Sequence, residues 1–229
     1  MLELIVQELR ALDNLVYSND DGESRRLRLR PPLEQPPGSL PEVLRQVLKV
    51  TQGLEGAEHV AEGPDFTGAL EGQFVEEFCP EGVCLATDGE GNGWTLDPAT
   101  GWIFYLCHDA PVVVYQFPGL LEFLQQFRRQ PSLSDFGTNL QAWASRIWRE
   151  NPGSLSSSQA LSLDSELADF ARQLGPDWTF IDLRKPNPGD GFSWGRFGPG
   201  TELRRHPSLP IVALKKPAKK PTFWSKLWG

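Results

Sequence analysis

The chain has 229 residues, of which 39% are hydrophobic and 23% charged, so it can form a core and wholesale disorder is not expected. Its formal net charge is −8, and its longest apolar run is residues 102–107, far shorter than the roughly 20 residues of a membrane-spanning helix. The acidic start, Met1–Glu8, lacks the basic residues of a signal peptide, and three cysteines form no disulfide framework. We therefore expect a cytoplasmic protein.

The first part of the chain is expected to form two helices with a strand between them. Apolar residues recur at helical spacing over 2–16, and alternation over 26–30 is typical of a short strand. Ser39 and Glu42 have the spacing of a capping box, which predicts a second helix that ends before Gly53.

The middle of the chain is expected to form an antiparallel meander. The glycine-rich segment 88–93 is typical of a turn between strands, and a helix is predicted over 119–130. The predicted strands are 83–87, 94–97, 102–107 and 112–115.

Beyond residue 131 we expect a smaller unit with helices. The apolar spacing predicts one helix through 136–147 and another that begins at a capping box, Ser156 with Gln159, and ends at Leu174. A strand is predicted over 178–182, followed by a loop over 185–200 and a tail over 203–229.

The order of a helix, a meander with a glycine-acid turn and a closing helix, over about 30–130, resembles the SUKH superfamily, the Smi1/Knr4-like proteins. The segments that carry the resemblance are Ser39–Gly53, where Gln52 replaces the usual asparagine, Val83–Trp94, Gly101–Tyr105 with His108–Asp109, and Tyr115–Leu124, where Pro118 and Gly119 depart from the pattern.

This resemblance implies an α+β fold, an antiparallel meander flanked by helices, that works by binding proteins and has no catalytic residues. Bacterial members are often immunity proteins that neutralise a toxin, frequently a nuclease, and fungal members act as regulatory scaffolds. We therefore predict three parts: a SUKH-like domain with its N-terminal helix over 1–130, a C-terminal α/β extension that is largely helical over 131–202, and a basic tail with proline and tryptophan over 203–229.

No metal or cofactor is expected. A calcium loop that began at Asp88 would need a glutamate at its twelfth position, where the chain has Ala99. Cys79 and Cys84 are too far apart in sequence for a zinc knuckle, and Cys107 with His108 would point to opposite faces of a strand. A hydrolase or metalloenzyme is the least favoured class.

Acidic residues gather in the middle of the chain. Residues 65–109 contain nine acids and no lysine or arginine. They form either a solubilising surface or a face for a basic partner, such as a toxin, and this charge would repel nucleic acid. The residues predicted to bind the partner are Asp88, Glu90, Asp97 and Asp109, with Trp94 and Trp102 as aromatic anchors.

The tail has the opposite charge. Residues 203–229 contain seven lysines and arginines and no acid, and aromatic residues follow the lysines. The tail would dock on a partner or weakly on a membrane surface, or else fold back on the acidic body, and basic residues with aromatics also bind single-stranded nucleic acid. The residues predicted to dock are Lys215, Lys216, Lys219, Lys220, Phe223, Trp224 and Trp228.

The leading hypothesis is a non-enzymatic immunity protein that occludes a basic toxin. The alternative is a Smi1/Knr4-like scaffold whose tail docks on a partner or a membrane surface.

Overall fold

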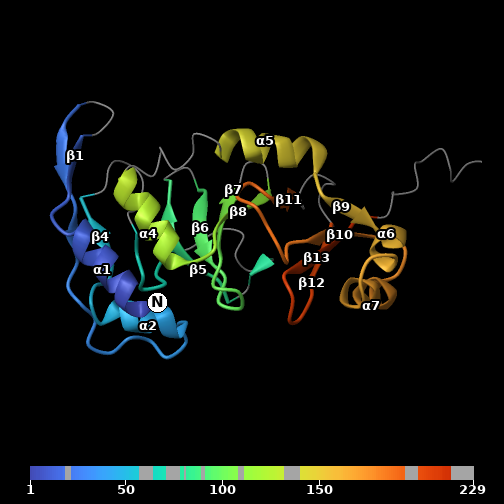
Figure 1. Cartoon of the computed structure of the whole chain (residues 1–229), viewed down its shortest axis with the longest axis horizontal. Coiled ribbons are helices and arrows are strands. Elements are labelled where there is room, and N and C mark those ends of the chain that lie inside the picture. Colours follow the sequence, from blue (N-terminus) through green and yellow to red (C-terminus); the bar gives the residue numbers. More distant parts are fainter. Residues whose placement is uncertain are drawn as a thin grey trace, which may run out of the picture.

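The computed structural model describes residues 1–18, 22–56, 64–70, 78–79, 81–88, 91–107, 111–131, 140–193 and 201–217. The fold is α+β, with helices packed around antiparallel sheets (Figure 1). In Figure 1 the N-terminal elements lie on the left, the central sheet in the middle, and a second sheet with its helices on the right. Within the described residues, no helix combines the length and the apolar character that crossing a membrane requires.

The N-terminal helix and strand are shorter than the sequence predicts. The helix over 2–16 ends at Leu12, because Asn14 adopts a positive φ of 63° and its N–H donates to Leu27. The strand over 26–30 is divided at the fully buried Leu27, so that its two halves pair with different strands. The elements are α1 (Leu2–Leu12), β1 (Val16–Ser18), β2 (Ser24–Arg26), β3 (Arg28–Leu29), α2 (Glu42–Leu48) and β4 (Leu54–Glu55).

The predicted capping box at the second helix does not form. Helix α2 begins at Glu42 with Pro41 as its N-cap, and no side chain caps it. The Glu42 carboxylate instead accepts hydrogen bonds from Arg45 and Gln46, which lie one turn further along the helix. These local contacts compete with the capping interaction, so that the helix starts later than Ser39.

The four predicted strands of the meander are confirmed with small shifts of their ends. They pair in sequence order, all antiparallel, and a fifth strand lies beside the last of them. The sheet has the order β11-β8-β7-β6-β5. Its strands are β5 (Val83–Thr87), β6 (Gly93–Leu96), β7 (Ile103–Cys107), β8 (Val112–Phe117) and β11 (Gly191–Ser193).

The two faces of this sheet are covered by different layers. Successive side chains of a strand point to opposite faces, so Tyr105 and Val114 enter one core while Phe104 and Val113 enter another. The first core contains α1, α2, α4 (Leu120–Arg129) and α5 (Leu140–Glu150). The helix predicted over 119–130 is confirmed as α4.

The predicted boundary at residue 130 does not separate two cores. Buried Leu140, Ala144 and Ile147 of α5 belong to the same core as the N-terminal helices. Strand β11, from the segment predicted as the loop 185–200, extends the central sheet next to β8. The extension over 131–202 is therefore interleaved with the meander.

A second antiparallel sheet packs on the other face of the meander. The strand predicted over 178–182 is confirmed as one of its two inner strands, and the capping box of Ser156 with Gln159 is present. The predicted helix from Ser156 to Leu174 is two helices, which cover the far face of this sheet. The elements are β9 (Ser154–Ser156), α6 (Ser157–Leu161), α7 (Ser165–Leu174), β10 (Trp178–Asp182), β12 (Glu202–Arg205) and β13 (Ile211–Lys215).

The segment 203–217 is part of the fold, although the sequence prediction placed it in the tail. Its strands β12 and β13 complete the order β12-β13-β10-β9, and Ile211–Leu214 is buried. The reason is the hydrophobic effect: this apolar run fills the space between the meander and α7. Residues 218–229 lie outside the described part of the chain.

Candidate functional site

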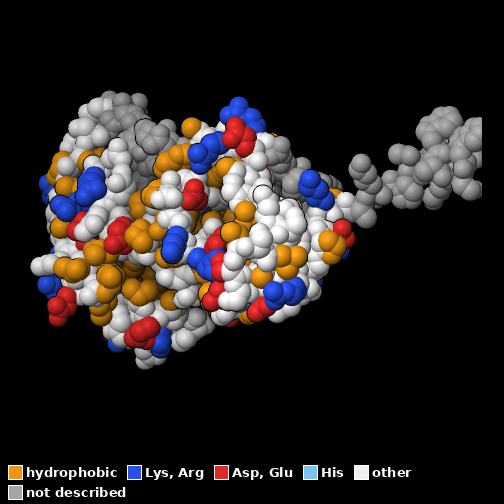
Figure 2. All heavy atoms as spheres, turned by 45° about the vertical axis from the view of Figure 1, so that its right-hand side comes forward, with side chains coloured by type: hydrophobic (Ala, Val, Ile, Leu, Met, Phe, Trp, Pro, Cys, Tyr) orange, Lys and Arg blue, Asp and Glu red, His pale blue; other side chains and the backbone are white. Residues whose placement is uncertain are grey.

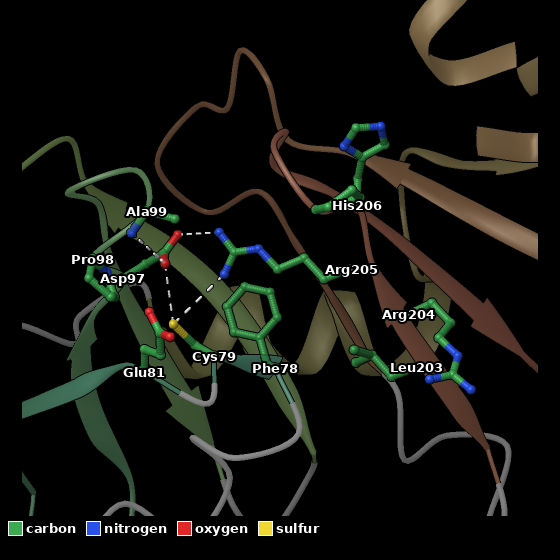
Figure 3. A pocket seen from close by; sticks show the side chains of 11 residues that line it. Phe78, Cys79, Glu81, Asp97, Pro98, Ala99, Leu203, Arg204, Arg205 and His206 are labelled. Carbon is green, nitrogen blue, oxygen red and sulfur yellow. Dashed lines mark hydrogen bonds and ion pairs between the residues drawn. The ribbon is translucent and has the colours of Figure 1, made fainter. Parts of the chain in front are cut away.

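A cavity of about 400 Å³ lies where β12 meets the meander (Figure 3). One wall comes from Phe78, Cys79, Glu81 and the turn after β6, and the other comes from β12 and the turn that follows it. The side chains around it are Phe78, Cys79, Glu81, Asp97, Pro98, Ala99, Leu203, Arg204, Arg205, His206 and Pro207.

Asp97 is the buried carboxylate of this cavity. It follows β6 directly and is 1% exposed. Its Oδ1 accepts from the Cys79 Sγ at 3.3 Å and the Ala99 N–H at 3.2 Å, and its Oδ2 accepts from the Thr100 hydroxyl at 2.7 Å. The contacts with Ala99 and Thr100, two and three positions further on, make Asp97 the first residue of the tight turn between β6 and β7.

Arg205 supplies the positive charge that Asp97 needs. Its side chain crosses from β12 to the meander, and its Nη2 donates to Asp97 Oδ2. The guanidinium also lies 5.5 Å from the ring centre of Phe78 (Figure 3). Burial by itself would raise the pKa of Asp97, but hydrogen bonds from Arg205 and Thr100 hold that pKa below its ordinary value.

Cys79 is held as a neutral thiol. Burial, followed by the negative charge of Asp97, raises the pKa of Cys79 to about 12. The thiolate is the reactive form of cysteine, so a thiol in this environment is not an activated nucleophile. Arg205 Nη1, 3.7 Å from the sulfur, lowers this pKa, but by less than burial raises it.

The ionisable groups at the centre of the cavity bond to one another. The acid, the guanidinium and the thiol are satisfied by one another, so none is poised to transfer a proton. What remains to meet a ligand is the half-buried surface of Leu203 and Pro98, together with the exposed side chain of Glu81.

The structure does not assemble the predicted acidic face from its described members. Trp94 is 1% exposed and packs against Tyr105 with 5.1 Å between ring centres, so it belongs to the core and cannot anchor a partner. Asp97 is also buried, and because it pairs with Arg205 it does not face a partner. Trp102 is half-buried and packs on Tyr115.

The other predicted acids have structural roles or lie outside the described residues. Asp88 holds the turn between β5 and β6, because it accepts from the Asn92 N–H at 3.1 Å and from the Tyr105 hydroxyl at 3.3 Å. Glu90 and Asp109 lie outside the described part of the chain. On the face that Figure 2 shows, positive and negative side chains are interspersed over the described surface.

Lys215, predicted to dock the tail, lies at the end of β13. Its Nζ is 3.6 Å from Glu202 and 5.8 Å from the ring centre of Trp178. Lys216 is exposed. The remaining predicted docking residues lie outside the described residues; they are Lys219, Lys220, Phe223, Trp224 and Trp228.

A second ion-pair cluster lies on the second sheet. Arg184 binds Asp164 at 2.5 Å and Asp182 at 2.7 Å, and Asp164 also accepts from the Leu167 N–H as the N-cap of α7. The hydrogen bonds from Arg184 lower the pKa values of both aspartates. This cluster joins α7 to the end of β10, and its charged groups form ion pairs with one another.

Sequence reasoning missed the centre of the site. Arg205 was placed in the tail, and Asp97 was predicted to be exposed. No local signal links two residues that are 108 positions apart. In the part of the chain that the structure describes, the three cysteines are buried and form no disulfide, and no group of three or more His, Cys, Asp or Glu could hold a metal ion.

Comparisons with family models, with curated proteins and with solved structures find no match for this chain. The resemblance to the SUKH superfamily therefore stays a prediction.

Proposed function

We propose that this chain acts by binding another protein, without catalysing a reaction. The observation that carries the proposal is that Asp97, Arg205 and Cys79 are hydrogen-bonded to one another beside a cavity. A general base or a nucleophile must exchange a proton near its working pH. The Asp97 carboxylate, whose pKa is lowered, and the Cys79 thiol, whose pKa is about 12, do not exchange a proton near neutral pH.

Within this class we propose the role of an immunity protein that neutralises a toxin by covering its active site. The net charge of −8 supports this role, because a negative protein is steered toward a basic surface such as that of a nuclease. An occluding inhibitor needs a rigid body rather than a reactive group. The ion pairs between elements provide such rigidity, for example Arg205 with Asp97 and Arg184 with Asp164.

The test is to mix the purified chain with the purified product of the adjacent gene at micromolar concentration. We expect a stable complex on size-exclusion chromatography and loss of the toxin's activity in proportion to complex formed. An unrelated acidic protein of similar net charge serves as the control for non-specific attraction. Absence of a complex would refute the immunity role.

A separate measurement tests the claim that the chain is not an enzyme. Elemental analysis of the purified protein should find no stoichiometric metal. One bound zinc per chain, or a saturable hydrolytic activity that Cys79→Ala abolishes, would overturn the proposal.

A further inference from the structure

Strand β12 is an edge of the second sheet, since β13 is its one neighbour among the described strands. The His206 N–H donates to the Ile211 carbonyl at 2.9 Å on the β13 side. Alternate residues of an antiparallel strand direct their backbone groups to opposite sides. Leu203 and Arg205 therefore direct their N–H and C=O groups away from β13, where no described residue is hydrogen-bonded to them.

The cavity adjoins this edge on the side of the meander. The side chains of Leu203 and Arg205 face it, and Phe78 and Pro98 belong to the opposite wall. Because Arg205 is neutralised by Asp97, a side chain that enters beside Leu203 meets the half-buried side chains of Leu203 and Pro98 next to a satisfied ion pair, and the exposed Glu81 would repel an acid there. An apolar side chain suits this position best.

On the opposite face of β12, the side chain of Arg204 favours a negatively charged side chain of a binding partner. Arg204 is exposed and points away from Asp97 in Figure 3, and no ion pair joins it to a described residue. Residues 201–217 contain four lysines and arginines against one acid, Glu202, which lies 3.6 Å from Lys215. An acidic side chain placed opposite Arg204 would have an unpaired cation as its partner.

We propose that the edge of β12 is a docking site for an extended segment of the partner protein. The segment adds a strand to the second sheet through the outward groups of Leu203 and Arg205. It places an apolar side chain in the cavity and the adjacent acidic side chain opposite Arg204. This inference rests on the proposed function and adds which kind of segment of the partner is bound. The net charge of the chain steers the encounter at long range, whereas the local contacts at β12 select the segment.

The experiment measures fluorescence anisotropy of a labelled peptide with the full chain. The probe is a short peptide of alternating valine and glutamate, and the comparison peptide has lysine in place of glutamate. Saturable binding of the glutamate peptide, roughly tenfold tighter than that of the lysine peptide, is expected from the charge of Arg204. In the variant Arg204→Glu the preference should reverse.

A pair of variants at one position isolates the backbone contact. Leu203→Pro removes an N–H that points away from β13, a change that an edge strand tolerates. Leu203→Ala shortens the same side chain but keeps the N–H. We expect Leu203→Pro to bind the glutamate peptide roughly fivefold more weakly than Leu203→Ala, as the loss of one hydrogen bond predicts. Circular dichroism verifies that both variants fold.

The outcomes separate the docking site from the proposed function. Equal affinity of the two Leu203 variants, or an unchanged charge preference in Arg204→Glu, would overturn the docking site. If the adjacent gene product binds Leu203→Pro and wild type equally, this site is wrong while protein binding stands. If the peptide binds and that product does not, the site stands and the immunity role fails. Self-association that Leu203→Pro abolishes would place a second copy on β12 and refute the proposed occupant.

Discussion

Replacing Arg205 with methionine tests whether an ion pair holds the second sheet to the meander. Methionine keeps an unbranched apolar side chain but removes the guanidinium, which lies 5.5 Å from the ring centre of Phe78. The carboxylate of Asp97, 1% exposed, would then be buried without its counter-charge. Removing one partner of a buried pair costs about 3–5 kcal/mol of unfolding free energy.

The contacts around Asp97 place the expected loss at the lower end of this range. The carboxylate keeps three donors in the variant, from Thr100, Ala99 and Cys79. We therefore expect a loss of about 3 kcal/mol. With a urea slope of about 3 kcal/mol per molar, the midpoint of unfolding falls by about 1 M.

The assay is urea denaturation followed by circular dichroism, with Arg204→Met as the matched control. Arg204 is the preceding residue of the same strand, and it is exposed with no ion pair to a described residue. Its replacement should change the unfolding free energy by less than about 0.5 kcal/mol. A loss in Arg205→Met below about 1 kcal/mol, similar to that of the control, would refute the reasoning.

The pH dependence of the same variant gives a second test. The pKa of Asp97 is lowered on folding, so its stabilising contribution is complete above the unfolded pKa of about 3.9 and is lost as pH falls through the lower folded pKa. In Arg205→Met, burial without the guanidinium should raise the pKa of Asp97. The carboxyl then becomes neutral at a higher pH, and the stability difference from wild type should shrink as the pH falls from the raised pKa of the variant to the lowered pKa of wild type. A difference that stays constant would contradict this account.

Three further predictions concern other parts of the chain. In a variant whose other two cysteines are alanine, Cys79 should react with a thiol reagent at mildly alkaline pH about a thousandfold more slowly in the native chain than in urea. The reason is that its pKa is raised to about 12. Similar rates in the two states would refute the assignment of Cys79 as a neutral thiol. In thermal denaturation, Ser156→Ala should cost about 1 kcal/mol because it removes the capping box of α6, whereas Ser158→Ala, which removes only a 3.0 Å contact with the Ser156 hydroxyl, should cost less. Ending the chain after Pro217 should leave the denaturation midpoint unchanged and toxin binding intact, while loss of binding would favour a scaffold that docks through residues 218–229.

Local patterns were sufficient for the meander. Strands β5 to β8 are short apolar runs separated by glycine-, asparagine- and proline-containing turns, and sequential strands with tight turns pair as antiparallel neighbours. The capping box at Ser156 was found for the same reason, because its two partners are three positions apart. The similar spacing at Ser39 was misleading, because Glu42 bonds within its own helix instead.

Two strands near the end of the chain, β11 and β13, could not be predicted locally. Residues 191–193 and 211–215 are flanked by glycine and proline, which indicate loops when the segment is considered alone. They become strands because β8 and β10 offer unpaired backbone groups and apolar surface beside them. The predicted boundary at residue 130 failed for the same reason, since α5 finds its core in the preceding part of the chain.

The sequence alone therefore determined the α+β class, the order of the meander strands and the charge difference between the body and the segment after residue 202, because these depend on composition and on neighbours a few positions apart. Only the tertiary structure decided that Asp97 and Trp94 are buried and that Arg205 neutralises Asp97 across 108 positions. Among 30 acids and 22 bases many ion pairs are conceivable, and the choice follows from how the sheets pack. The desolvation of a carboxylate depends on the groups that surround it in space, and the residues near Asp97 in sequence do not indicate that β12 packs against it.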